Sequence, residues 1–163
     1  LKRIFKRQQR IKDLNYQDLK EISLKHNKPI PLLQDLLKIS KDKFFLFIEI
    51  KPKLSTKLLR KLIKETSKYS KCVFISFKHE NIFNLLKLNK KIQVGLSFSP
   101  PTTVKSIVKK SIIKNINFLI LDKSFIKNRK IRDLKIEKYF YTIKNNSEFR
   151  KYNKKNNLIF ENL

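Results

Sequence analysis

A carboxylate and an ammonium group end one apolar stretch of this sequence and are its best candidates for chemistry. Residues 44–53 read Phe-Phe-Leu-Phe-Ile-Glu-Ile-Lys-Pro-Lys, so an apolar run leads into Glu49, and Ile50 separates it from Lys51. Side chains two positions apart in a strand lie on the same face. Glu49 and Lys51 therefore point the same way at the carboxyl end of the predicted strand, where parallel α/β folds bind ligands. A solvated or mutually paired couple of charges is the alternative interpretation.

The strand that positions this pair is predicted to be buried. An unbroken apolar run rich in β-branched and aromatic residues is typical of a parallel strand covered on both faces. The run begins at Phe44, and Pro52 ends it because proline cannot donate to the ladder. Phe45 and Phe47 are expected on the face of Glu49, and the other apolar residues of the run on the opposite face.

Helices and strands are expected to alternate along the rest of the chain. Two helices precede the first strand, over 15–22, where Asn15 can cap the start, and over 32–39. Residues 1–13, with few apolar anchors, are interpreted as a surface loop. Later strands are expected at 72–77, 92–98, 117–121, 137–143 and 158–160, and helices at 56–69, 80–88, 102–113 and 147–153. Residues 122–134 are predicted to be a loop with a short helix.

This alternation predicts βαβ units on a parallel sheet of six strands. Such a sheet can be open and doubly wound, or it can be most of an eight-stranded barrel. The dinucleotide-binding open sheet usually has a glycine-rich turn after its first strand, and Gly95 is the one glycine of this chain. A barrel takes about 250 residues, so 163 residues are short for one by about two βα units.

Composition narrows the functional classes. The formal net charge of +27 comes from 40 Lys and Arg against 13 Asp and Glu. The lysines are spread over the whole chain, and the sequence has abundant Lys, Asn, Ile and Phe and no Ala, so residue bias explains the charge better than a specific nucleic-acid surface does. The lone cysteine, Cys72, is expected in the core. No apolar stretch approaches the roughly 20 residues of a membrane span, and we expect a cytoplasmic location.

Several segments, in a shared order, resemble the glycerophosphodiester phosphodiesterase family. Ile30-Pro31-Leu32-Leu33-Gln34-Asp35-Leu36-Leu37 followed by Ile48-Glu49-Ile50-Lys51 is similar to that family's Ile-Pro-Thr-Leu-Glu-Glu-Val-Leu segment and its strand ending in Glu-x-Lys. Leu1-Lys2-Arg3 looks like the start of the loop after the family's His-Asp motif. Ser76-Phe77, Tyr141-Thr142-Ile143 and Leu158-Ile159-Phe160-Glu161-Asn162 resemble its Ser-Phe, Trp-Thr-Val and final strand. The likeness spans essentially the whole chain.

The resemblance implies a TIM-type (β/α)₈ barrel that is incomplete in this chain. Residues 1–163 would form a single, N-terminally truncated domain holding strands three to eight, and the first two βα units would be missing. In the family those units carry a His-Arg pair, a Glu-x-Asp pair and the His-Asp motif, and none of these precedes the quoted segments here.

The resemblance also implies an enzyme of lipid metabolism, a hydrolase that cleaves glycerophosphodiesters to glycerol 3-phosphate and an alcohol. Glu49 would be a ligand of a divalent metal, Mg²⁺ or Ca²⁺, whose charge suits phosphoryl oxygens. Lys51 would be the catalytic and substrate-binding cation on a phosphate oxygen, and Tyr141 would line the substrate pocket. His26 and His79 match neither family histidine and are interpreted as surface residues, so this chain alone is expected to be inactive.

A second hypothesis is a non-catalytic barrel remnant. Its basic surface would bind anionic lipid or nucleic acid, with strongly salt-dependent affinity. From the two hypotheses together we expect two kinds of partner, a small-molecule glycerophosphodiester and an anionic membrane in peripheral contact. We expect no specific nucleic acid, because the lysines are spread over the whole chain.

Overall fold

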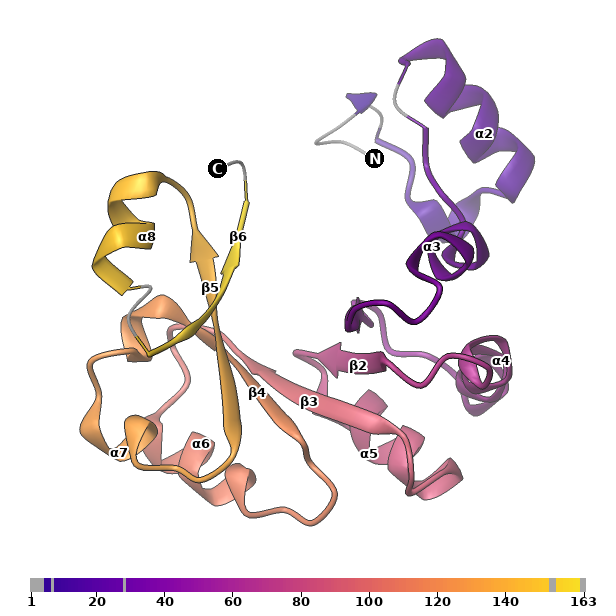
Figure 1. Cartoon of the computed structure of the whole chain (residues 1–163). Coiled ribbons are helices and arrows are strands. Elements are labelled where there is room, and N and C mark those ends of the chain that lie inside the picture. The colour runs from indigo at the N-terminus through magenta and orange to yellow at the C-terminus, as the bar shows by residue number, and fades with distance from the viewer. Residues whose placement is uncertain (1–4, 7, 28, 153–154, 162–163) are drawn as a thin grey trace. The chain divides into compact units, whose positions relative to one another are not determined.

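The computed structural model describes residues 5–6, 8–27, 29–152 and 155–161 (Figure 1). The chain forms two compact units, residues 1–41 and residues 42–163. Leu1-Lys2-Arg3, quoted above for its resemblance, lies outside the described residues. The single-domain interpretation stays a prediction.

The first unit holds a 3₁₀ turn, Ile11–Asp13, and two helices, α2 (Tyr16–Lys25) and α3 (Leu33–Ser40). The predicted cap at Asn15 is confirmed. Its side chain accepts a hydrogen bond from the backbone N–H of Asp18, and the Asp18 carboxylate accepts one from the Asn15 N–H, each at 3.0 Å. This reciprocal pair satisfies two otherwise free amides at the helix start.

One part of the predicted surface loop is buried instead. Phe5 is almost fully enclosed, and its ring centre lies 5.5 Å from that of His26. The sequence does not predict the burial of Phe5, because the residue lies in a basic stretch and a single aromatic residue shows no hydrophobic periodicity. His26 itself is exposed, as predicted.

The second unit is built on a parallel sheet of six strands in chain order, from β1 to β6. Its strands are β1 (Leu46–Glu49), β2 (Cys72–Ser76), β3 (Gln93–Phe98), β4 (Phe118–Asp122), β5 (Glu137–Ile143) and β6 (Asn157–Phe160). Each pair of neighbours is parallel. The α/β prediction with six strands is therefore confirmed for the part of the chain that the structure describes.

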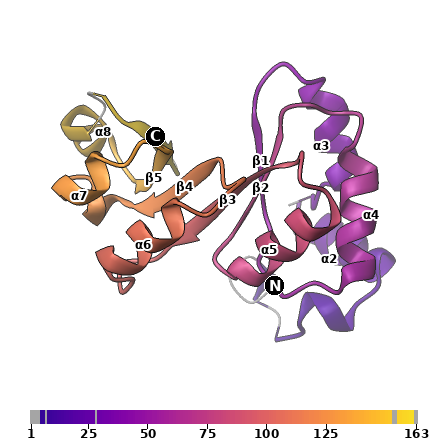
Figure 2. The same ribbon diagram turned by 90° about the horizontal axis from the view of Figure 1, so that it is seen from below.

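The described helices of this unit pack on one face of the sheet (Figures 1 and 2). They are α4 (Thr56–Thr66), α5 (His79–Leu88), α6 (Val104–Ser111), α7 (Arg129–Arg132) and α8 (Asn146–Tyr152), with a 3₁₀ turn, Lys123–Phe125, before α7. A doubly wound sheet carries helices on both faces, whereas a barrel carries them outside only. One-sided cover with strands in sequential order is thus consistent with a partial TIM-type barrel.

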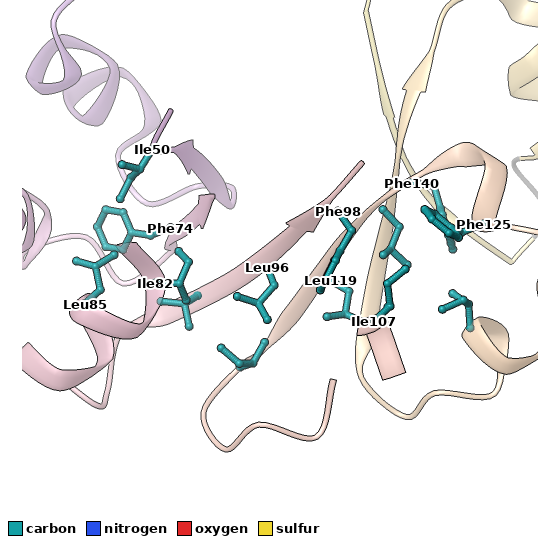
Figure 3. Packing of buried hydrophobic residues seen from close by; sticks show 14 of the residues in the cluster. Ile50, Phe74, Ile82, Leu85, Leu96, Phe98, Ile107, Leu119, Phe125 and Phe140 are labelled. Atoms are coloured by element: carbon teal, nitrogen blue, oxygen red, sulfur yellow. The ribbon is translucent and has the colours of Figure 1, made fainter. Parts of the chain in front are cut away.

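Two apolar clusters follow from this arrangement. Under the helices, Leu59 of α4, Leu85 of α5, Ile107 of α6 and Ile131 of α7 pack against outward-facing strand residues such as Phe74 (Figure 3). The opposite face of the sheet carries a smaller cluster of Val73, Ile75, Phe118 and Ile120, with Phe47, Tyr139, Tyr141 and Ile159 beside it. The strands therefore bury both faces, as their apolar runs predict.

The first strand is shorter and less buried than expected. Phe44 and Phe45 precede β1 and are about half exposed, and the residues of β1 are partly buried or exposed. The cause is the sheet edge, because β1 pairs with β2 alone and β6 with β5 alone among the described strands. The predicted alternation is nevertheless present, with Phe47 in the helix-free cluster and Ile48 and Ile50 under the helices.

Asp42 fastens the start of β1 to the start of β2. Its backbone is left-handed, with φ of 59°. Its carboxylate accepts hydrogen bonds from the N–H and hydroxyl of Ser70, at 2.7 and 2.8 Å, and from the N–H of Lys71 at 2.9 Å. These bonds, the two backbone ones foremost, lower the pKa of Asp42. They fix the register from which β1 runs towards Glu49.

No helix among the described residues is long and apolar enough to cross a bilayer. The predicted burial of Cys72 is confirmed.

Gly95 lies at a close approach between the central strands. A Cβ built there would come within 3.1 Å of the Ile75 Cγ2 atom and within 3.2 Å of both Cβ and the carbonyl oxygen of Phe118. A residue without a Cβ fits here because Ile75 of β2 and Phe118 of β4 leave little space beside β3 on the helix-free face. Gly95 is the one glycine of the chain.

We predict that Gly95→Ala lowers the free energy of unfolding by about 1–3 kcal/mol, the usual cost of overpacking a filled core. Gly95→Val should cost more, because valine adds two methyl groups to a Cβ that already meets these atoms. Urea denaturation followed by circular dichroism measures both values. Equal stability of all three proteins would contradict the close packing of β2, β3 and β4.

Candidate functional site

Glu49 and Lys51 lie where the sequence places them, at the carboxyl end of the sheet. Glu49 is the last residue of β1 and pairs in register with Ile75 of β2. The Lys51 Nζ donates a hydrogen bond to the Glu49 Oε2 at 3.0 Å. The Glu49 side chain is 31% exposed and that of Lys51 is 78% exposed. The two charges thus form the mutual pair considered above, and a ligand at this edge would meet both.

Tyr141, the predicted pocket residue, reaches across the same end of the sheet. It lies on β5, and its hydroxyl donates a hydrogen bond to the Phe98 carbonyl oxygen, on β3, at 2.9 Å. Its ring meets Phe77 edge to face, with centres 5.8 Å apart. Burial foremost, together with the negative charges of Asp122 and Glu49, raises the pKa of Tyr141 to about 12. Both carboxylates therefore act on one phenol, which links β1, β4 and β5 in a single electrostatic environment.

Two residues of this environment were missed in the sequence. Asp122 ends β4 opposite Tyr141, and its Oδ1 accepts a hydrogen bond from the Ser124 N–H at 2.9 Å. Ser97 of β3 pairs with Ile120 and so faces the helix-free side. Ser97 is 2% exposed. Among the described residues, its hydroxyl is the one buried side-chain polar atom without a hydrogen-bond partner.

A signal for Asp122 was present. It is the first polar residue after an apolar strand, as Glu49 is after 44–48, and parallel strands bring such positions to one edge. Ser97 has no such signal, because a serine flanked by Leu96 and Phe98 is equally expected in a core. Glu49, Ser97, Asp122 and Tyr141 together are called the mouth residues below.

The loop after Glu49 is held in place by a buried amide. Asn81 of α5 is 1% exposed and donates through Nδ2 to the Pro52 carbonyl oxygen at 2.8 Å, while its Oδ1 accepts from the Leu54 N–H at 3.0 Å. Ser76 adds a second tie, because its hydroxyl donates to the Ile50 carbonyl oxygen at 2.6 Å. These bonds fix the backbone on both sides of Lys51 and position its side chain.

His79 is a correction to the sequence interpretation, because it is half-buried and not a surface residue. Its Nε2 lies 2.9 Å from the Ser97 carbonyl oxygen, which only an N–H can satisfy, so Nδ1 is left to accept from the Lys110 Nζ at 2.8 Å. Burial lowers the pKa of His79, and the nearby Lys110 charge lowers it further against the raising effect of the carbonyl bond. A neutral imidazole bonded at both nitrogens is structural.

The described residues do not by themselves form a metal site. No group of three or more His, Cys, Asp or Glu side chains that could hold an ion occurs in the part of the chain that is described. Glu49 supplies one carboxylate, and one of its oxygens is bound by Lys51. Mg²⁺ and Ca²⁺ need six or more oxygen ligands, some of them water, so one carboxylate is far from sufficient.

Known structures share this fold. A glycerophosphodiester phosphodiesterase from Thermotoga maritima matches over 98% of this chain and 71% of its own, with a TM-score of 0.77 and 18% identity. A phosphodiesterase from Oleispira antarctica, solved in complex with the product sn-glycerol-3-phosphate, matches over the same shares with a TM-score of 0.76 and 19% identity. A glycerophosphodiester phosphodiesterase from Parabacteroides distasonis matches over 90% of this chain and 66% of its own, with a TM-score of 0.65 and 16% identity.

No family model and no curated protein matches the sequence. At these identities the likeness concerns the fold. The resemblance to glycerophosphodiester phosphodiesterases that the sequence indicates is confirmed at that level, over nearly the entire chain.

We predict that Asn81→Ala lowers the free energy of unfolding by about 2–4 kcal/mol. It leaves the Leu54 N–H and the Pro52 carbonyl without partners, and each unsatisfied buried group costs about 1–3 kcal/mol. Urea denaturation measures the loss. Asn89→Ala is the matched control, because Asn89 is half-buried and its side chain accepts one local bond, from the Lys91 N–H. Equal losses in the two variants would show that Asn81 does not anchor the loop.

We also predict an alkaline limit to stability set partly by Tyr141. A tyrosine whose folded pKa is raised from 10.0 to about 12 stabilises the fold below pH 10 and loses that contribution as the pH rises through 12. Absorbance at 295 nm during a pH titration should show Tyr139 and Tyr141 ionising late, because burial raises the pKa of Tyr139 to about 12 as well. Tyr141→Phe and Tyr139→Phe should each remove one late-titrating group, and an unchanged titration in Tyr141→Phe would contradict its burial at the mouth.

Proposed function

We propose that this chain is the larger part of a hydrolase that cleaves glycerophosphodiesters to glycerol 3-phosphate and an alcohol. The observation that carries the proposal is the position of Glu49 and Lys51 at the carboxyl end of a sheet whose fold matches such enzymes over 98% of the chain. That one neighbour was solved with sn-glycerol-3-phosphate supports a small-molecule ligand at this edge. A role in lipid metabolism and a cytoplasmic location belong to the same proposal.

The six strands would be strands three to eight of a (β/α)₈ barrel in one domain. The match to 71% of the Thermotoga chain supports this numbering. The other two βα units, of about 30 residues each, would pair with the free edges of β1 and β6 and close the barrel. In this proposal the complete protein carries them.

Several side chains at this end of the sheet have roles that fit their surroundings. Lys51, a flexible and exposed cation, would bind a phosphate oxygen as a point charge. Tyr141 and Phe77 form an aromatic wall against which a glycerol unit can pack. The carboxylate of Asp122 is an acceptor suited to a hydroxyl group of the substrate.

A divalent cation, Mg²⁺ or Ca²⁺, is part of the proposal, with Glu49 as one ligand. Such an ion neutralises charge on phosphoryl oxygens. Because the described residues form no group of three or more potential ligands, most of the other ligands would have to come from outside them. No described residue offers a free imidazole at this edge, since His79 is bonded at both nitrogens, so these 163 residues alone are expected to be inactive.

We predict that Glu49→Gln lowers kcat/KM for glycerophosphocholine at least about 100-fold in the protein that carries the complete barrel. Loss of a residue that only hydrogen-bonds to a metal ligand already costs about 10–100-fold, and loss of a direct ligand costs more. The assay follows release of glycerol 3-phosphate, with and without a chelator. Lys51→Gln should mainly raise KM, because the charge that binds substrate is removed.

Glu65→Gln is the control, because Glu65 forms a helix ion pair with Lys61 at 3.9 Å on α4. Its activity should equal that of the unchanged protein. Metal-dependent turnover by residues 1–163 alone would overturn the incomplete-barrel part of the proposal. Full activity of Glu49→Gln would overturn its role as a ligand.

The non-catalytic alternative is favoured by one observation, the 3.0 Å ion pair that occupies both candidate side chains. In that case 40 cationic residues serve as a general anion-binding surface. Binding would fall steeply with salt, and Glu49→Gln would leave it unchanged.

A further inference from the structure

An open groove runs between α6 and α7, which lie beside each other (Figure 2). It measures about 600 Å³, and its lining is almost wholly apolar. Val104 and Val108 of α6 form one side, and Asn128, Arg129 and Lys130 form the other, with Lys105 at the rim. This α6–α7 groove is on the helix layer and shares no lining residue with the mouth residues.

The apolar floor of the groove continues onto the surface. Val104, Val108 and Ile112 follow one another at intervals of four, which is the spacing of one helical face. Ile112 is 81% exposed, whereas Ile107, three positions after Val104 on the same helix, is fully buried in the core. Val104 packs partly against the core beneath α6, so the second apolar face, which core packing does not explain, consists of Val108 and Ile112.

Cations surround this second face and carboxylates are scarce. The chain has no Asp or Glu from residue 81 to residue 121 and none from 123 to 132. Lys105, Lys109 and Lys130 are exposed and form no ion pair with a described carboxylate, while Arg129 pairs loosely with Asp133 at 3.7 Å. The rim of the groove is therefore positive over an apolar floor.

The apolar floor and the positive rim of the groove together favour some ligands over others. A second copy of a chain with net charge +27 is repelled. A nucleic acid would gain from aromatic side chains on which bases stack, and those that line the groove are aliphatic or polar. A free phosphate ion gains nothing from an apolar floor. An anionic bilayer offers headgroup phosphates to the cations and an acyl boundary to the apolar residues.

We propose that the α6–α7 groove and Ile112 form a docking surface for anionic lipid bilayers. Ile112 and the two valines would enter the headgroup boundary, and the lysines would lie on lipid phosphates. The proposal does not depend on catalysis at the mouth residues.

The test is flotation of the full chain with vesicles, which separates bound protein from aggregates. One set contains phosphatidylcholine alone, and the other an equimolar mixture of phosphatidylcholine and phosphatidylglycerol. We expect binding to the mixed vesicles only. Ile112→Ser should weaken it at least about 5-fold, and Lys105→Gln with Lys109→Gln about 25-fold, from about 1 kcal/mol per cation near an anionic surface.

Controls come from α4, which also carries an exposed leucine among lysines. Leu58→Ser matches the loss of an apolar side chain, and Lys57→Gln with Lys64→Gln matches the loss of two charges. Circular dichroism confirms that each variant is folded, and all exchanged side chains are solvent-accessible. Both α4 variants should bind nearly as the unchanged chain does.

Three outcomes would overturn the proposal. The first is no binding to mixed vesicles. The second is an equal loss in the α4 and α6 variants, which would indicate diffuse charge. The third is tighter binding to a short DNA duplex than to vesicles at the same salt, unaffected by Ile112→Ser, which would assign the surface to nucleic acid.

Discussion

Parallel pairing in chain order is the constraint from which the candidate site follows. Because every strand runs the same way as its neighbour, all carboxyl ends lie along one edge of the sheet. Residues more than 90 positions apart, from Glu49 to Tyr141, are thereby brought to one end. An antiparallel sheet of the same strands would send alternate ends to opposite edges, and no combination of side chains at the mouth would form.

The helix-free face sets a second limit, because it must be filled by side chains of the strands themselves. The aromatic rings of Phe47, Phe118 and Tyr139 meet edge to face there, with centres 4.8 to 5.9 Å apart. Such contacts add about 0.5–1.5 kcal/mol each beyond area burial. Gly95 leaves room for them at β3. The mouth residues thus stand on an apolar layer that excludes water from below.

Much of this architecture was predictable from the sequence. The apolar runs gave strand positions to within two residues, and Asn15 caps α2 as predicted. The alternation of β1 placed Glu49 on the face of Phe47. What could not be predicted depends on contacts between segments distant in sequence. The bonds of Asn81 span up to 29 positions and those of His79 up to 31, and no local pattern encodes such partners. The burial of His79 and the position of Ser97 therefore cannot be predicted from the sequence, whereas Asp122, the first polar residue after an apolar strand, can be.

Residues in the first turn of α5 form hydrogen bonds with two different parts of the fold. Asn81 holds the loop around Pro52, and His79, two residues earlier, joins the Ser97 carbonyl of β3 to Lys110 of α6. Elements that are hydrogen-bonded to the same turn open together in native-state fluctuations. The loop that carries Lys51, the end of β3 and the inner side of α6 therefore belong to one cooperative opening unit. Their amides should share one opening free energy in hydrogen exchange, although the mouth and the helix layer face different surroundings.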